Sequence, residues 1–107
     1  MKRKICVLTS SRADYNHLYI LMNKLRESKD IDFKLIITGM HTLKKFGYTY
    51  KEVIYDGFKP SYIINTNQKN LNEKGLIEAM SMQLKKAYSA IKKLNPDIFI
   101  VLGDRYD

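Results

Sequence analysis

The fold is decided near the amino terminus, where residues 5–15 read Ile5-Cys6-Val7-Leu8-Thr9-Ser10-Ser11-Arg12-Ala13-Asp14-Tyr15. The first four residues form a short continuous apolar run, which is typical of a strand buried on both faces of a parallel sheet. After the polar turn, apolar residues repeat with the 3.6-residue helical period at Leu18, Leu21, Met22 and Leu25. We expect Asp14 to cap this helix and the helix to end near Ser28. The stretch therefore predicts a buried strand, a polar turn and a helix.

The middle of the chain continues the alternation of strands and helices. Strands are predicted at Phe33–Ile37 and Tyr62–Ile64, where apolar and β-branched residues cluster. A short helix is predicted at Thr49–Tyr55, because Thr49 and Glu52 have the spacing of a capping box. Asp56-Gly57 supplies a stop for this helix.

The last third of the chain contains the longest helical pattern. Helical spacing is kept over five turns by Leu76, Met80, Leu84, Ala87, Ile91 and Leu94. Asn95-Pro96-Asp97 ends the helix, since the residue before a proline disfavours helical backbone. Ile98–Leu102 is again a continuous apolar run and predicts a fourth strand.

Strands that alternate with helices require right-handed crossovers and a parallel sheet, so the predicted class is α/β with a Rossmann-like sheet. In such sheets ligands bind beyond the carboxyl ends of the strands, at the switch point of the strand order. Here that point is expected between the Ser11-Arg12-Ala13-Asp14 and Gly103-Asp104-Arg105 loops. The sequence stops at Asp107, where the next helix of an alternating fold would begin. We therefore expect residues 1–107 to be an incomplete amino-terminal Rossmann-like domain of a longer protein.

The net charge of +8 comes from 19 Lys and Arg residues spread over the whole length. Lys85-Lys86 and Lys92-Lys93 recur on one helix and indicate a solvated face. No basic stripe interleaves with aromatic residues, so we do not expect nucleic acid as a partner. A membrane partner is not expected either, because no apolar run approaches the roughly 20 residues of a membrane helix.

The cysteine and histidine content limits the possible chemistry. A single Cys6 allows no internal disulfide, and a cytoplasmic location is expected. His17 and His41 lack the spacing of a zinc module, so no metal site is predicted. Neither a G-x-G-x-x-G nor a Walker motif is present, and no dinucleotide or triphosphate cradle is indicated.

Polar residues at the predicted strand ends are the candidate site. Arg12 lies before a helix amino terminus, which favours an anion such as phosphate, although a surface arginine is an equally good interpretation. Asp104 and Arg105 follow a buried strand, and this position favours a carboxylate for proton transfer beside a guanidinium over an ordinary ion pair. His41 follows the second strand and can reach the same cleft, or it is a surface histidine.

Three segments in order resemble the hydrolysing UDP-N-acetylglucosamine 2-epimerases. They are the Thr9–Tyr15 loop, Thr38-Gly39-Met40-His41 with Phe46–Tyr50, and Leu102-Gly103-Asp104-Arg105-Tyr106. The Arg-Ala-Asp-Tyr form of the first segment is like the hydrolysing branch, whereas the non-hydrolysing epimerases usually carry Gly-Thr-Arg-Pro-Glu there. The resemblance covers essentially the whole chain.

The resemblance implies two Rossmann-like domains facing each other across a cleft, a GT-B-type architecture of which the second domain is absent here. It implies sugar or phosphate contacts from Arg12, Asn16, His41 and Arg105, and acid-base chemistry by Asp104. Asn16 departs from the small residue often found at its position.

The implied reaction converts UDP-N-acetylglucosamine to N-acetylmannosamine and UDP by elimination and hydration. It uses no redox cofactor, and the full-length protein is expected to be a homo-oligomer. We expect the 107-residue chain alone to be inactive. Alternatives are a 2-epimerase of a UDP-diacetamido sugar, a GT-B-type glycosyltransferase, a response-regulator-like binding module and a basic nucleic-acid binder.

Overall fold

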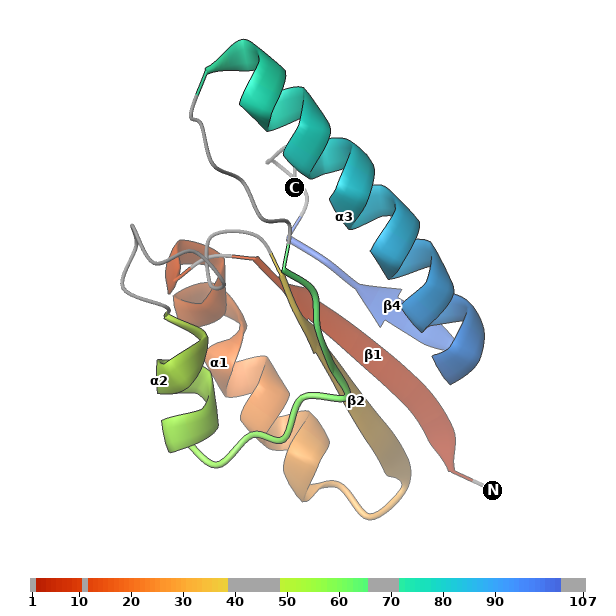
Figure 1. The fold of residues 1–107 in the computed structure, drawn as a ribbon. Coiled ribbons are helices and arrows are strands. Elements are labelled where there is room, and N and C mark those ends of the chain that lie inside the picture. Colours follow the sequence, from red (N-terminus) through yellow and green to blue (C-terminus); the bar gives the residue numbers. More distant parts are fainter. Residues whose placement is uncertain (1, 11, 39–48, 66–71, 103–107) are drawn as a thin grey trace.

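The computed structural model describes residues 2–10, 12–38, 49–65 and 72–102. The elements follow the predicted order (Figure 1) and are β1 Arg3–Thr9, α1 Arg12–Glu27, β2 Ile31–Ile37, α2 Tyr50–Tyr55, β3 Tyr62–Ile63, α3 Glu73–Leu94 and β4 Ile98–Ile100. None of the helices in these residues is long and apolar enough to cross a membrane.

All four strands form one parallel sheet in the order β3-β2-β1-β4. β1 is internal, as predicted, because it pairs with β2 along its whole length and with β4 over Ile5–Val7. The chain adds β2 and β3 on one side of β1 and then returns to the other side with β4. The switch point therefore lies between β1 and β4, and the predicted Rossmann-like α/β class is confirmed.

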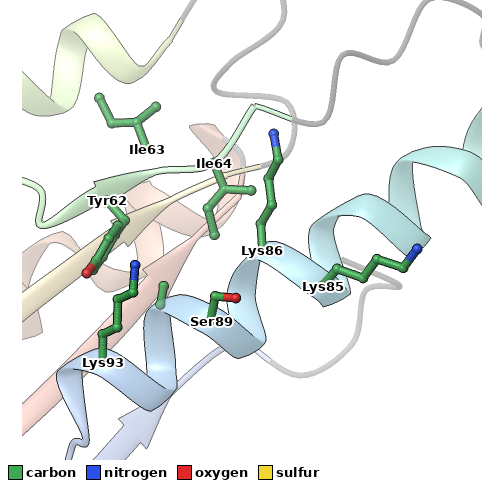
Figure 2. Close-up of a pocket in the computed structure, with 8 residues that line it drawn as sticks. Tyr62, Ile63, Ile64, Lys85, Lys86, Ser89 and Lys93 are labelled. Atoms are coloured by element: carbon green, nitrogen blue, oxygen red, sulfur yellow. The ribbon is translucent and has the colours of Figure 1, made fainter.

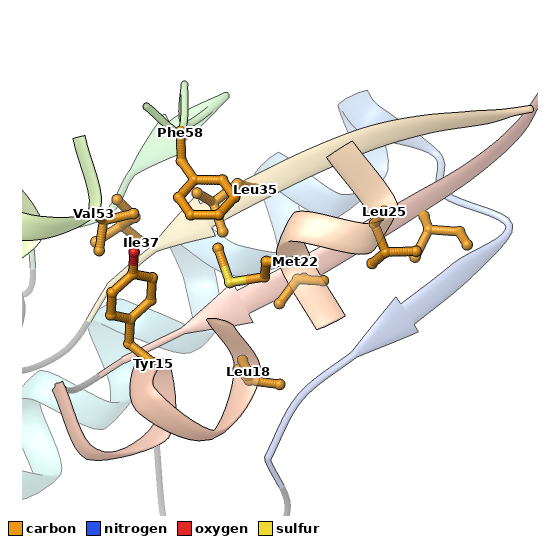
Figure 3. Close-up of a cluster of buried hydrophobic side chains, with 10 residues drawn as sticks. Tyr15, Leu18, Met22, Leu25, Leu35, Ile37, Val53 and Phe58 are labelled. Atoms are coloured by element: carbon orange, nitrogen blue, oxygen red, sulfur yellow. The ribbon is translucent and has the colours of Figure 1, made fainter. Parts of the chain in front are cut away.

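One face of the sheet is covered by α1 and α2 (Figure 1). Strands and helices meet there in a core whose members are Ile5, Val7, Tyr15, Leu18, Met22, Leu25, Leu35, Ile37, Val53 and Phe58. Figure 3 shows the α1 side chains pointing toward those of β2 and toward Phe58. Alternate strand residues face this core, because successive side chains of a strand point to opposite faces. Three members of the repeat predicted for α1, Leu18, Met22 and Leu25, pack here, whereas the fourth, Leu21, is exposed.

The opposite face is covered by α3, which crosses from β3 to β4 (Figure 1). Its smaller core contains Cys6, Leu8, Ile36, Ile64 and Ala90, with Ala87, Ile91 and Leu94 packed against them. Other members of the same apolar repeat do not reach this core, since Leu84 is 73% exposed and Met80 is also exposed. Only the carboxyl-terminal half of the predicted stripe thus packs on the sheet.

The helix ends agree with the sequence at two predicted stops and differ at one predicted cap. Gly57, with φ of +93°, follows the α2 cap Asp56, and Asn95 ends α3 in the left-handed conformation, so both predicted stops are confirmed. The predicted capping box is wrong, because Thr49 has helical backbone angles and its side chain makes no cap hydrogen bond. The α3 cap was not predicted, and it is Asn72, whose side-chain oxygen accepts from the Gly75 N–H at 2.8 Å.

β4 is shorter and more exposed than a strand buried on both faces. It spans three residues, and Ile98 and Phe99 are each about 40% exposed. The reason is its place at the edge of the sheet, where it has β1 on one side only.

Candidate functional site

The turn between β1 and α1 is held by a buried carboxylate. Asp14 accepts hydrogen bonds from the Thr9 hydroxyl, from the Ser10 hydroxyl at 2.7 Å and from the Ser10 N–H at 3.1 Å. All three side chains are almost fully buried. The predicted N-cap role of Asp14 is therefore wrong, because α1 begins at Arg12 and Asp14 lies inside its first turn. Its oxygens instead join the helix to Thr9, the last residue of β1, and to Ser10, which follows it.

The ends of β1 and β2 are joined at the same edge of the sheet. The Thr38 N–H donates to the Thr9 carbonyl at 3.0 Å, one residue beyond the regular strand pairing. Thr38 is fully buried, and its hydroxyl has no hydrogen-bond partner within the described residues.

Arg12 and Asn16 lie on the first turns of α1, directly after this edge. They are four residues apart and therefore neighbours on one face of the helix. Asn16 is exposed. The first turn of a helix has backbone N–H groups without helical partners, and the helix dipole adds positive potential there. The backbone position of Arg12 thus suits the binding of an anion at the switch point.

The other predicted site residues, His41, Asp104 and Arg105, lie outside the described residues. The structure does place β4 parallel and adjacent to β1, with Ile100 opposite Val7. The carboxyl ends of β1 and β4 therefore lie side by side, which is the arrangement expected for the two candidate loops.

A second cluster links α1 to α2 and was missed by sequence reasoning. The Tyr15 hydroxyl donates to Asp56 Oδ2 at 2.5 Å, and Arg26 Nη1 donates to the Asp56 carbonyl at 3.1 Å. The Arg26 guanidinium also lies 4.2 Å from the ring centroid of Phe58. Burial, and next the hydrogen bond to Asp56, raise the pKa of Tyr15 well above its usual value. Tyr15 thus stays neutral and serves as a donor.

The sequence held only a weak signal for this cluster. Asp56-Gly57 was interpreted as a helix stop, which is correct, but nothing local pairs Asp56 with Tyr15, 41 residues earlier. The pairing depends on the packing of α2 beside α1.

Cys6 is a free thiol that is buried in the smaller core. Burial raises the pKa of the Cys6 thiol to about 11, so the thiol is protonated near neutral pH and is a poor nucleophile. Among the described residues, no three His, Cys, Asp or Glu side chains come together in a way that could hold a metal ion.

The sequence profile of the UDP-N-acetylglucosamine 2-epimerase family matches residues 23–107. A GDP/UDP-N,N'-diacetylbacillosamine 2-epimerase (hydrolyzing) from Campylobacter jejuni is 35% identical over 99% of this chain. A UDP-N-acetylglucosamine 2-epimerase from Neisseria meningitidis is 32% identical over the whole chain. This chain spans 27% of the length of each of these two relatives.

Solved structures show the same fold. A crystal structure of a UDP-N-acetylglucosamine 2-epimerase superposes with a TM-score of 0.72 at 22% identity, covering 99% of this chain and 28% of the other. The Neisseria meningitidis UDP-GlcNAc 2-epimerase, bound to UDP-GlcNAc, gives a TM-score of 0.73 at 18% identity, covering 96% of this chain and 26% of the other.

Proposed function

Because this chain belongs to the UDP-N-acetylglucosamine 2-epimerase family, we propose that it is the amino-terminal part of a hydrolysing UDP-sugar 2-epimerase. The observation that carries the proposal is the match over nearly the whole chain to the Campylobacter jejuni relative, whose name includes the hydrolysing 2-epimerase activity. The Neisseria meningitidis relative is named as a UDP-N-acetylglucosamine 2-epimerase. The β1–α1 turn supports it, since its sequence contains the Arg-Ala-Asp-Tyr motif and its end faces the switch point.

The first candidate substrate is UDP-N-acetylglucosamine, with N-acetylmannosamine and UDP as products. A UDP-diacetamido sugar is the second candidate, favoured by the slightly higher identity to the Campylobacter jejuni relative, 35% against 32%. The two sugars differ at C4 and C6, so the same chemistry at C1 and C2 serves both.

The reaction needs three functions from the protein. A base removes the C2 hydrogen, while the C1–O bond breaks and UDP leaves as an anion with the bonding electrons. Water then adds across the resulting double bond, its hydroxyl to C1 and a proton to C2 from the opposite face. Positive groups stabilise the departing pyrophosphate, and a carboxylate stabilises positive charge at C1.

The candidate residues divide these functions among themselves. Arg12, at the start of α1, and Arg105 bind the pyrophosphate, with Asn16 and His41 contacting sugar or phosphate. Asp104 acts in proton transfer or stabilises C1. The complete enzyme has a second Rossmann-like domain across the cleft, is a cytoplasmic homo-oligomer, and uses no redox cofactor.

The proposal is tested with the intact protein and both UDP-sugars in heavy water and in ¹⁸O-labelled water. Elimination and hydration predict release of UDP and of a free 2-epimeric sugar, with deuterium at C2 and labelled oxygen at C1. The preferred substrate is the one with the higher kcat/KM. Release of UDP without inversion at C2, or an absence of turnover with both sugars, would refute the proposal.

A further inference from the structure

A cavity of about 380 Å³ lies at the edge of the sheet opposite to β4, between β3 and α3. Its lining residues are Tyr62, Ile63, Ile64, Lys85, Lys86, Ser89, Ala90 and Lys93. Figure 2 shows Lys86 and Lys93 projecting from α3 toward β3, with Ser89 between them. These three residues follow the i, i+3, i+7 spacing of one helix face. The cavity thus has one side formed by a helix face and the other by a short edge strand.

The charge of this cavity is entirely positive. Three lysines line it and no acidic residue does. Within the described part of the chain, none of these lysines forms an ion pair with a carboxylate. Lys86 Nζ donates to the Asn65 carbonyl at 2.9 Å, which fixes its position and leaves two of its three N–H donors. An anion placed here would relieve the repulsion among the ammonium groups.

The floor of the cavity is apolar. Ile64 and Ala90 are buried there, and the ring of Tyr62 lies beside them (Figure 2). A ligand site typically combines such an apolar surface with a few polar groups that fix orientation. The floor favours a ligand with a ring, and the lysines favour a phosphate or carboxylate on that ring.

The cavity is separate from the switch point. Neighbouring strands lie about 4.8 Å apart, so β3 is about 10 Å from β1 and about 15 Å from β4. The cavity therefore lies two to three strands away from the switch point, at the other edge of the sheet.

We propose that the β3–α3 cavity is a second binding site, for a small anionic molecule that joins a ring to a phosphate or carboxylate group. The ring packs on Ile64 and Tyr62, and the anionic group binds Lys86 and Lys93, with the Ser89 hydroxyl as an additional donor. The proposal goes beyond the epimerase reaction and does not depend on it.

The test uses phenyl phosphate as the probe and methyl NMR of the intact protein. The Ile64 methyl signal, assigned with an Ile64→Val variant, reports the cavity, and the Ile100 methyl signal reports the region of the switch point. We expect phenyl phosphate to shift the Ile64 signal to saturation, and inorganic phosphate and phenol to bind more weakly. No saturable shift at Ile64 would overturn the site. Equal binding of inorganic phosphate would overturn the ring-bearing ligand class.

Matched variants separate a built site from general electrostatic attraction. Lys86→Gln with Lys93→Gln is expected to weaken the Ile64 response at least about tenfold, as two charge-assisted contacts are lost. Lys92→Gln changes the charge of the same helix outside the cavity and should change the affinity less than about twofold. An equal loss in the Lys92→Gln protein would show nonspecific attraction and overturn the proposal. Unchanged Ile100 signals without ligand serve as the folding control.

Discussion

The hydroxyl of Tyr15 donates a hydrogen bond to the carboxylate of Asp56, and this 2.5 Å contact joins α1 to the residue that ends α2. The Tyr15 ring is 4% exposed and packs edge-on against Tyr19 and Phe58. The Arg-Ala-Asp-Tyr segment therefore anchors a neighbouring helix in addition to starting its own.

Replacement of Tyr15 by Phe removes this hydrogen bond and keeps the ring. We expect the free energy of unfolding to fall by about 1.5–3 kcal/mol, the range for a hydrogen bond to a charged group. Tyr19→Phe is the matched control, because Tyr19 belongs to the same aromatic cluster, and it should change the free energy by less than about 0.5 kcal/mol. Urea denaturation measures both values, and equal effects would contradict the assignment.

Stability should also depend on pH through Tyr15. Its pKa is raised in the folded state, so the unfolded chain loses this proton first, near the ordinary value of about 10. The contribution of the Tyr15 hydroxyl is then complete below pH 10 and decreases as the pH rises above it. The stability difference between wild type and Tyr15→Phe should shrink between pH 9 and about pH 11. A constant difference over this interval would show that the pKa is not raised.

Asp14→Ala should be more damaging than the loss of a surface carboxylate. It leaves the buried Thr9 and Ser10 hydroxyls and the Ser10 N–H without their acceptor, which costs about 2–4 kcal/mol of unfolding free energy. Asp14→Asn keeps one acceptor oxygen, so its free energy of unfolding should lie between those of the wild type and of Asp14→Ala. The control is Asp32→Ala, which removes a partly exposed ion pair with Lys34 and should cost no more than about 0.5 kcal/mol.

Arg12→Ala tests the anion site at the start of α1. In the intact enzyme we expect UDP-sugar binding to weaken by about 1–3 kcal/mol, the range for a lost charge-assisted hydrogen bond. Arg3→Ala removes the same charge from the opposite end of β1 and should leave binding unchanged. An unchanged KM and unchanged inhibition by UDP in the Arg12→Ala enzyme would assign Arg12 to the surface.

Asp104→Asn distinguishes a catalytic from an orienting carboxylate. If Asp104 transfers a proton or stabilises charge at C1, kcat should fall by about 100-fold or more with little change in KM. If it only orients Arg105, KM should rise while kcat is nearly unchanged. Steady-state kinetics with thermal unfolding measured alongside decides between them, and a near-normal kcat would remove Asp104 from the chemistry.

The order and type of the elements could be predicted because they depend on local periodicity. The run Ile5–Leu8 predicted the centre of β1, and the repeat from Leu76 to Leu94 predicted α3 to within three residues at its start. The switch point between the first and fourth strands also followed from general rules of α/β folds. These features depend on backbone pattern and on burial, which the sequence displays directly.

The side-chain contacts of the site could not be predicted in the same way. Asp14 was expected to cap a helix, and only the structure shows that its carboxylate accepts from Thr9 and Ser10. The Tyr15–Asp56 contact depends on how two helices pack, which has no local signature. The roles of His41, Asp104 and Arg105 stay predictions, because these residues lie outside the described parts of the chain.

The pairing of β4 with β1 has a consequence for the order of assembly. Lys4 and Asp97, 93 positions apart in sequence, exchange two hydrogen bonds of 2.8 Å. Lys4 Nζ also donates to the Leu94 carbonyl at 2.7 Å, across 90 positions. Closing so long a loop costs entropy before any contact offsets it, which slows folding. During synthesis on the ribosome, β1, α1, β2, α2 and β3 emerge first and can assemble through nearer contacts. The edge of β1 that pairs with β4 then stays unpaired until β4 has been translated. The docking of β4 is therefore the late step in the folding of residues 1–107.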